Sequence, residues 1–168
     1  MENIINEIAK KAHKLGACQQ GYRELLSATS KHDLCHSYIK NLDFCLEHNF
    51  PSNEYIRKHF KGIMEEQGVY LDDVIELNNR RICITLGKTN GRIIASEYSV
   101  SEIYAKHQSA LNIVAKDNAF VMVDVYDDAV VNVYASDRAQ VCVNRHGGKI
   151  TYNATGDAVV KIMEKSNN

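Results

Sequence analysis

The sequence predicts an α+β protein in which an N-terminal helical domain is followed by a parallel β-helix (β-solenoid) built on a ten-residue repeat. Two observations lead to this prediction. Apolar residues recur every three or four positions in the first 68 residues and every second position afterwards. The second half also aligns with itself in rows of ten. No flexible Ser/Gly linker separates the halves, so we expect two domains, residues 1–68 and 69–168, that pack together.

The first half is expected to contain four helices. The first has an apolar face and ends at Gly16, because glycine adopts the left-handed cap without strain. A short second helix carries Tyr22, Leu25 and Leu26. Ser30 and Asp33 predict a capping box that opens an unbroken third helix, whose inner stripe is Leu34, Tyr38, Leu42, Cys45 and Leu46. Pro51 ends it, and Ser52 or Asn53 caps a fourth helix that runs to Gly68.

The repeat is visible when residues 110–149 are written as "ALNIVAKDNA", "FVMVDVYDDA", "VVNVYASDRA" and "QVCVNRHGGK". The second and fourth columns are aliphatic, the eighth is mostly aspartate and the tenth mostly alanine. These columns hold Leu111, Val121, Val131 and Val141; Ile113, Val123, Val133 and Val143; Asp117, Asp127 and Asp137; and Ala119, Ala129 and Ala139. Agreement in several columns at once indicates internal repetition.

Each row predicts a strand of about six residues and a corner of about four, in which aspartate accepts backbone hydrogen bonds. Two rows per coil, or about 20 residues, would stack Asn112 on Asn132 and would align Ala95, Ala115 and Ala135. Right-handed winding is the expected hand. An antiparallel meander is the alternative, but it needs hairpin turns with positive φ, which "TNGR" and "HGGK" offer and "DNA", "DDA" and "DRA" do not. The segment "VVKIMEKSNN" is expected to form a last strand or short helix with a charged tail that discourages further stacking.

Composition narrows the class of protein. Apolar residues make up 45% and charged residues 24% of the 168 residues, which indicates a globular chain. The net charge of −1 argues against a nucleic-acid or membrane-surface binder. No apolar run reaches the ~20 residues of a membrane helix, and no secretory signal is evident, so we expect a cytoplasmic location. The five cysteines have irregular spacing and are expected to be reduced rather than paired.

The rows "NVYASDRAQVCV" and "NIVAKDNAFVMV" resemble the Ala/Val/Asp repeats of bacterial right-handed parallel β-helix proteins, including bactofilin-like filaments and adhesin-head-like solenoids. The whole chain is similar to uncharacterised helical-plus-solenoid proteins of gut bacteria and their mobile elements. The repeat resemblance covers residues 80–163 and implies an architecture. It brings no catalytic residues, and the helical first half weakens any inference that the chain forms filaments.

Two patterns suggest metal sites. His32, Cys35, Cys45 and His48 resemble a four-ligand zinc set, but an unbroken helix would hold the two pairs about 20 Å apart. Asp117, Asp127 and Asp137 could bind calcium if they were stacked. Lys116 and Arg138 would neutralise them, and turn capping is the favoured role. We therefore assign no metal ligand, cofactor or catalytic residue from the sequence.

Two further features interrupt the repeat. Arg145 and the segment His146-Gly147-Gly148 indicate either a functional bulge or an altered corner. Four tyrosines occupy odd-numbered columns of the repeat and are expected to face solvent. There they would suit carbohydrate or protein recognition, or they would only stack on the faces of the solenoid: Tyr98, Tyr104, Tyr126 and Tyr134.

The sequence favours a non-enzymatic structural or recognition module. Its helical domain would dock to a partner, and its solenoid would serve as a rigid spacer or binding face. The expected partner is a protein or a second copy of the chain, with carbohydrate as a further class and with no nucleic acid or membrane. The alternative is a carbohydrate-active enzyme of the β-helix type, although about eight rows with tight corners leave little room for a substrate groove.

Overall fold

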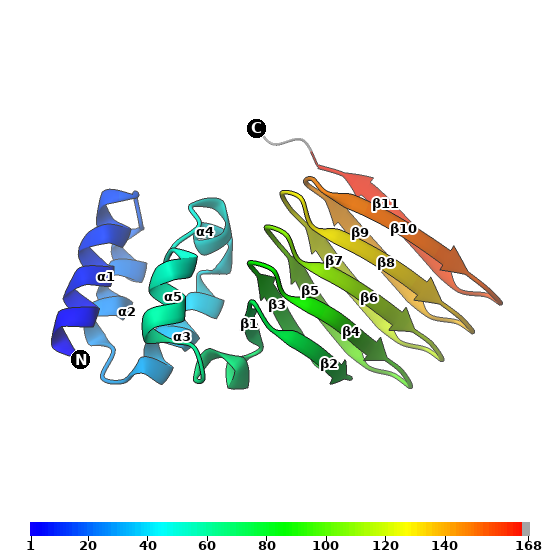
Figure 1. The fold of residues 1–168 in the computed structure, drawn as a ribbon, viewed down its shortest axis with the longest axis horizontal. Helices are drawn as coiled ribbons and strands as arrows, with labels where there is room; N and C mark the ends of the chain where they lie inside the picture. Colours follow the sequence, from blue (N-terminus) through cyan, green and yellow to red (C-terminus); the bar gives the residue numbers. More distant parts are fainter. Residues whose placement is uncertain (166–168) are drawn as a thin grey trace. The chain divides into compact units, whose positions relative to one another are not determined.

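The computed structural model describes residues 1–165 and separates the chain into two units, residues 1–67 and residues from Gly68 onward. The first unit is helical (Figure 1). Its elements are α1 (Glu2–Lys14), α2 (Gln19–Ser27), α3 (Lys31–Lys40), α4 (Leu42–Glu47), α5 (Asn53–His59) and the short 3₁₀ helix η1 (Met64–Gln67). Each α-helix buries apolar side chains on one face except α2, where Gly21 is the buried residue.

The predicted capping box is confirmed at the start of α3. The Asp33 backbone N–H donates to the Ser30 Oγ at 3.1 Å, and the Ser30 backbone N–H donates to the Asp33 Oδ2 at 2.9 Å. The Asp33 carboxylate also accepts the backbone N–H of Thr29 at 2.8 Å. These bonds satisfy donors that the first turn of a helix leaves without partners. They also lower the pKa of Asp33 to about 2.

Two predicted helix boundaries were wrong. The third helix is not continuous, because Asn41 leaves the helical region at φ −112° and ψ 37° and divides it into α3 and α4. The Asn41 side-chain amide donates to the Ser37 carbonyl at 2.9 Å, a local bond that competes with helical hydrogen bonding. The fourth helix ends at His59 rather than Gly68, and Gly62 follows with a φ of +87°.

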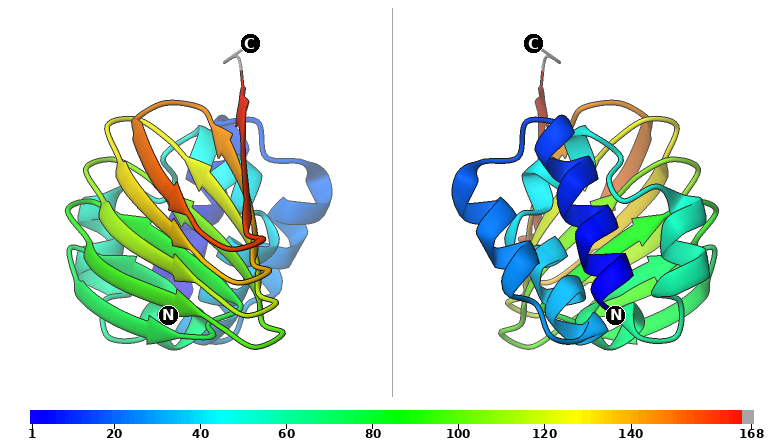
Figure 2. Two further views of the ribbon diagram at one scale, coloured as in Figure 1. Left: turned by 90° about the vertical axis from the view of Figure 1, so that its right-hand side faces the viewer. Right: turned by 90° about the vertical axis from the view of Figure 1, so that its left-hand side faces the viewer.

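The second unit is a parallel β-solenoid of about five turns (Figures 1 and 2). Successive strands alternate between two sheets. The six-stranded sheet contains β1 (Val69–Leu71), β3 (Ile82–Leu86), β5 (Val100–Ala105), β7 (Phe120–Val125), β9 (Gln140–Arg145) and β11 (Val159–Glu164). The five-stranded sheet contains β2 (Val74–Asn78), β4 (Asn90–Ala95), β6 (Ala110–Ala115), β8 (Val130–Ala135) and β10 (Lys149–Ala154).

The predicted two-row coil is confirmed by the strand register. Asn112 lies beside Asn132, and Ala115 lies between Ala95 and Ala135. The paired strands within residues 1–165 are all parallel, so the meander alternative is excluded. The segment beginning at Val159 forms the strand β11, so the charged residues Glu164 and Lys165 of the expected tail lie at the end of that strand and directly after it; residues 166–168 lie outside the described residues.

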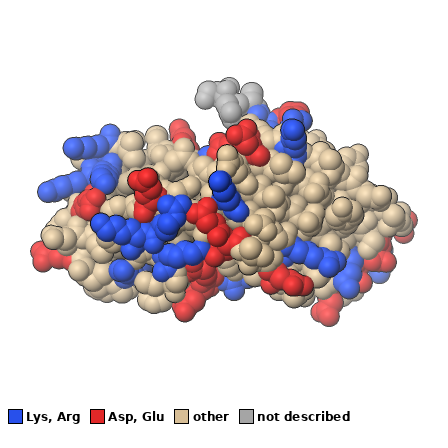
Figure 3. Space-filling model, viewed as in Figure 1, with Lys and Arg blue, Asp and Glu red and all other residues tan. Residues whose placement is uncertain are grey.

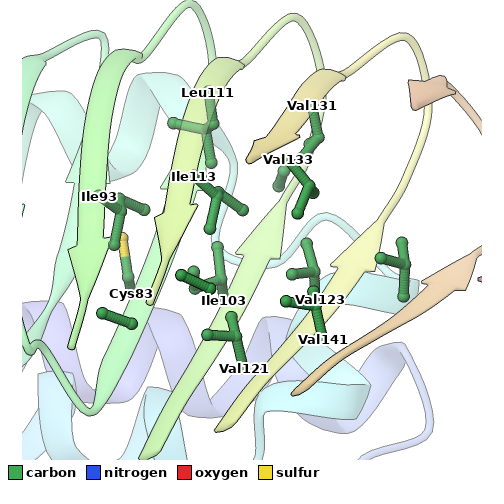
Figure 4. Close-up of a cluster of buried hydrophobic side chains, with 14 of the residues drawn as sticks. Cys83, Ile93, Ile103, Leu111, Ile113, Val121, Val123, Val131, Val133 and Val141 are labelled. Carbon is green, nitrogen blue, oxygen red and sulfur yellow. The ribbon is translucent and has the colours of Figure 1, made fainter. Parts of the chain in front are cut away.

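The aliphatic columns form the core between the two sheets (Figure 4). Ile113, Val123 and Val143 are fully buried, as are Ala115 and Val125 at the ends of their strands. Figure 4 shows side chains from neighbouring coils pointing into the same interior, among them Leu111, Ile113, Val121 and Val131. These columns are aliphatic because burial of methyl and methylene groups is the main driving force available to such a thin layer.

The corners differ from the prediction in their backbone conformation. Asp117, Asp127 and Asp137 have φ values of +60°, +53° and +59°, although the "DNA", "DDA" and "DRA" corners were expected to lack positive φ. Aspartate is among the few non-glycine residues that adopt this left-handed region readily. A positive φ therefore does not distinguish a hairpin from a solenoid corner in this sequence.

Candidate functional site

The corner aspartates bind the preceding coil. The Asp117 carboxylate accepts the backbone N–H of Glu97 at 2.9 Å, Asp127 accepts that of His107 at 3.1 Å, and Asp137 accepts that of Asp117 at 3.1 Å. Each bond therefore joins residues 20 positions apart and fixes one corner on the next. The backbone N–H of Asp117 lowers the pKa of Asp137, with smaller contributions from Ser136, Lys116 and Arg138.

The three aspartates do not form one column. Each coil has two corners, and successive ten-residue rows alternate between them. Asp127 therefore binds the corner of His107, whereas Asp117 and Asp137 share the other corner with Glu97. Nowhere in residues 1–165 do three His, Cys, Asp or Glu side chains gather as metal ligands would. The calcium arrangement that stacking would have required is thus not formed, and the carboxylates cap corners.

The zinc-like pattern is dispersed over two helices. Cys35 and Cys45 are buried, and burial raises the pKa of their thiols to about 11 and about 12. His32 is exposed, and His48 packs on Phe44 with 4.5 Å between ring centroids. Within the part of the chain that the structure describes, these four side chains do not gather as the ligands of one ion would. The cysteines of the described residues are all free, as predicted.

The His146 corner brings together a cluster that we call the His146 cluster: Lys106, Asp124, Tyr126, Asp127, Asn144 and His146. The His146 ring stacks on Tyr126 with 4.3 Å between centroids and 13° between ring planes. Its Nε2 lies 3.0 Å from the Asp124 Oδ1, and Asn144 donates to the other oxygen of that carboxylate at 3.2 Å. Lys106, Tyr126 and His146 follow one another at intervals of 20 residues, which is one coil.

A buried cation lies beneath this stack. Lys106 is only 6% exposed, and its Nζ lies 3.2 Å from the Asp127 Oδ2 and 5.3 Å from the centre of the Tyr126 ring. A carboxylate and an aromatic face together compensate the cost of burying an ammonium group.

The Asn144 Oδ1 is buried and has no hydrogen-bond partner. The His146–Asp124 pair has the chemistry of an acid–base couple, but Tyr126 covers one face of the imidazole.

The "HGG" corner is shortened by one residue. Val130 aligns with Lys149, 19 positions later, whereas Ala110 aligns with Val130 at 20. The backbone N–H groups of His146 and Gly147 both donate to the Val125 carbonyl, at 2.9 and 3.1 Å. Gly148 has a φ of +72°, and a Cβ there would lie 2.2 Å from the Ala129 carbonyl oxygen. The segment is thus an altered corner that brings His146 over Tyr126.

The outer face of the five-stranded sheet is free of charge over two adjacent strands. We call it the uncharged face, and its residues are Ala110, Asn112 and Val114 on β6 and Val130, Asn132 and Tyr134 on β8. Asn132 donates to Asn112 at 3.1 Å and accepts from the Thr151 hydroxyl at 2.6 Å. Tyr134 is 52% exposed. Figure 3 shows a broad area without Lys, Arg, Asp or Glu on the side of the solenoid that faces the viewer.

The predicted exposure of the tyrosines is confirmed for two of the four. Tyr98 is 81% exposed and Tyr134 is 52% exposed. Tyr104 and Tyr126 are half-buried, and the imidazole of His146 covers Tyr126. Arg145 forms an ion pair with Glu164 at 3.3 Å on the neighbouring strand.

No protein-family model matches this chain, and no curated protein or solved structure matches it either. The fold supports the resemblance to β-solenoid repeats, but it does not indicate the organism from which the chain comes. Among residues 1–165, no helix has the length and apolar character needed to cross a bilayer.

Proposed function

We propose that this chain is a non-enzymatic recognition module in which the solenoid presents the uncharged face to a protein partner. The main observation in support is that Val114, Val130 and Tyr134 lie beside hydrogen-bonded amides on a face without charge. Flat surfaces that combine aromatic and aliphatic groups with amides, and that lack charge at their centre, suit protein interfaces. Arg92 and Lys149 on the flanking strands supply a charged margin.

Rigidity supports the same role. Asp117, Asp127 and Asp137 are each bonded to the preceding coil, and the cluster of buried residues between the sheets is hydrophobic. Such a surface loses little conformational entropy on binding, which favours affinity. As parts of the same proposal, we propose that the solenoid is right-handed like those of bacterial β-helix proteins, that the module works in the cytoplasm, and that the helical unit is a docking domain.

A charge placed on the uncharged face tests the proposal. Tyr134→Glu should abolish capture of the binding partner from a cell extract, because it would bury a carboxylate in the interface. Tyr98→Glu is the matched control, since Tyr98 is an exposed tyrosine of a corner. Equal capture by both variants and by the unmodified chain would contradict the proposed face. A glycan array run with the same variants distinguishes a carbohydrate ligand from a protein partner.

The enzymatic alternative has one observation in its favour, the His146–Asp124 pair. A lyase assay on acidic polysaccharides measures it directly. Turnover that disappears in His146→Ala would establish the enzyme and displace the recognition proposal, whereas the recognition proposal expects no product.

A further inference from the structure

The outer face of the six-stranded sheet is largely apolar over β5, β7, β9 and β11. We call it the Met122 face, and it consists of the outward side chains at the even positions of 100–104, 120–124 and 140–144 and at the odd positions of 159–163. Val100, Phe120 and Val159 on this face are 50%, 36% and 57% exposed. Half-buried sulfur side chains, Met122 and Cys142, occupy its centre. The solenoid thus has a second broad surface, on the sheet opposite the uncharged face.

The middle row of this face has opposite charges at its two ends. The strand register places four residues side by side in this row: Glu102, Met122, Cys142 and Lys161. All four point outward, because the residues on either side of them in each strand are buried or pack against the core. Within residues 1–165, neither Glu102 nor Lys161 forms an ion pair. A half-turn about the centre of the row therefore exchanges an acidic end for a basic one.

We propose that a second copy of this chain packs on the Met122 face, related by a two-fold axis that runs along the strands between β7 and β9, in the plane where the two sheets meet. This inference goes beyond the proposed function because it concerns the other sheet. The axis places β5 opposite the partner's β11 and β7 opposite the partner's β9. Glu102 then lies opposite the partner's Lys161, and the symmetry makes this contact twice. An axis along the solenoid would instead place each charge opposite its own copy, so the charges select the first arrangement.

The rows on either side of the charged row fit the same arrangement. Val100 lies opposite the partner's Val159, and the sulfur side chains at the centre meet those of the other copy. Asp124 lies opposite the partner's Asn144, which is an amide rather than a second carboxylate. Sheets that pack face to face in this way bury the side chains of both faces in a layer about 10 Å thick. Because the Met122 face runs along the side of the solenoid, a further coil would extend it without covering it.

The size of the Met122 face determines how strongly the copies can associate. Each of its four strands has six residues. Strands lie about 4.8 Å apart and residues rise about 3.3 Å each, which gives a face of roughly 400 Å² per copy. An area of this size is at the low end for specific interfaces. The dimer should therefore be weak and should dissociate on dilution.

Sedimentation velocity of the full chain over a concentration series tests the inference, with exchange between one and two chains as the expected result. Glu102→Lys and Lys161→Glu should each weaken dimerisation by about tenfold, because two attractive contacts become repulsive. The double variant should dimerise like the unmodified chain, since its two charges have only changed places. Lys88→Glu makes the same charge change at an exposed lysine of a corner, and as the matched control it should also dimerise like the unmodified chain.

Met122→Asp provides a second variant and should give single chains, because a carboxylate would be buried between the two sheets. Circular dichroism verifies that this variant keeps the strand signal of the unmodified chain, and if it does not, the double charge variant decides. A single-chain mass for the unmodified protein at its highest soluble concentration would overturn the inference. A dimer that resists Met122→Asp, or a double charge variant that dimerises no better than the single variants, would also overturn it. Tyr134→Glu, which tests the uncharged face, should leave this dimer intact, so the two proposals fail separately.

Discussion

The helical unit and the solenoid bury their apolar residues in different ways. In the helical unit each helix has its own boundaries and its own apolar stripe, and no position repeats another. In the solenoid, from β3 onward, the core positions of neighbouring coils are 19 or 20 residues apart, and equivalent residues lie side by side. Periodicity therefore determines three-dimensional neighbours in the solenoid, whereas in the helical unit it determines only the face of a helix. Substitutions should reveal this difference.

The largest effect is expected for a truncation in the solenoid core. Ile113 is fully buried between two aliphatic neighbours, so Ile113→Ala should lower the free energy of unfolding by about 2–5 kcal/mol. Chemical denaturation followed by circular dichroism at a strand wavelength measures the change. Val114→Ala, at the adjacent outward position, should cost much less. Equal losses for both variants would show that the column is not the source of stability.

The second effect compares two glycines with positive φ. Gly148 in the solenoid has a φ of +72°, and an added Cβ would lie 2.2 Å from the Ala129 carbonyl oxygen, whereas Gly62 in the helical unit has a φ of +87° and nothing within 4 Å of that position. Gly62→Ala should cost about 1 kcal/mol through backbone strain alone. Gly148→Ala should cost clearly more, because the backbone of the neighbouring coil must also move. Thermal unfolding of both variants gives the comparison, which similar midpoints would contradict.

The sequence predicted the solenoid more completely than the helices for a physical reason. The columns that contain Val123 and Val133 specify strand, face and neighbour together, since a one-residue slip would turn every side chain outward. The break at Asn41 was missed because asparagine is neither glycine nor proline, and its effect depends on a bond from its side chain to Ser37. Local competition of this kind leaves little trace in a periodicity.

The His146 cluster was missed because rows of ten separate residues that a coil of 20 brings together. Lys106, Tyr126 and His146 fall in successive coils at one corner, and Asp124 lies one coil from Asn144. Aligning the sequence in rows of 20 would have revealed these columns. The uncharged face was also missed, although the two-row coil had already placed Asn112 on Asn132, because the other outward residues of those two rows were not compared.

A smaller effect is expected at the helix cap. Ser30→Ala removes the hydroxyl that accepts the Asp33 N–H and should cost about 1 kcal/mol. Ser27→Ala is a suitable control, since the Ser27 hydroxyl donates to the Glu24 carbonyl near the end of α2. Hydrogen exchange of α3 amides measures the local opening. Faster exchange that spreads equally into solenoid strands would contradict the view that caps act locally.

The smallest effect is an acid dependence that both units share. Hydrogen bonds from Thr29 and Ser30 lower the pKa of Asp33 from 3.8 to about 2, and the Asp117 N–H lowers that of Asp137. A carboxyl group whose pKa is depressed by folding contributes stability above its unfolded pKa and loses it as the pH falls through its folded pKa. Asp33→Asn and Asp137→Asn should each lower the thermal midpoint at neutral pH and leave it nearly unchanged at the acid end. For Asp33 the loss falls between pH 3.8 and about 2. A matched shift at both pH values would mean that the side-chain shape matters and the charge does not.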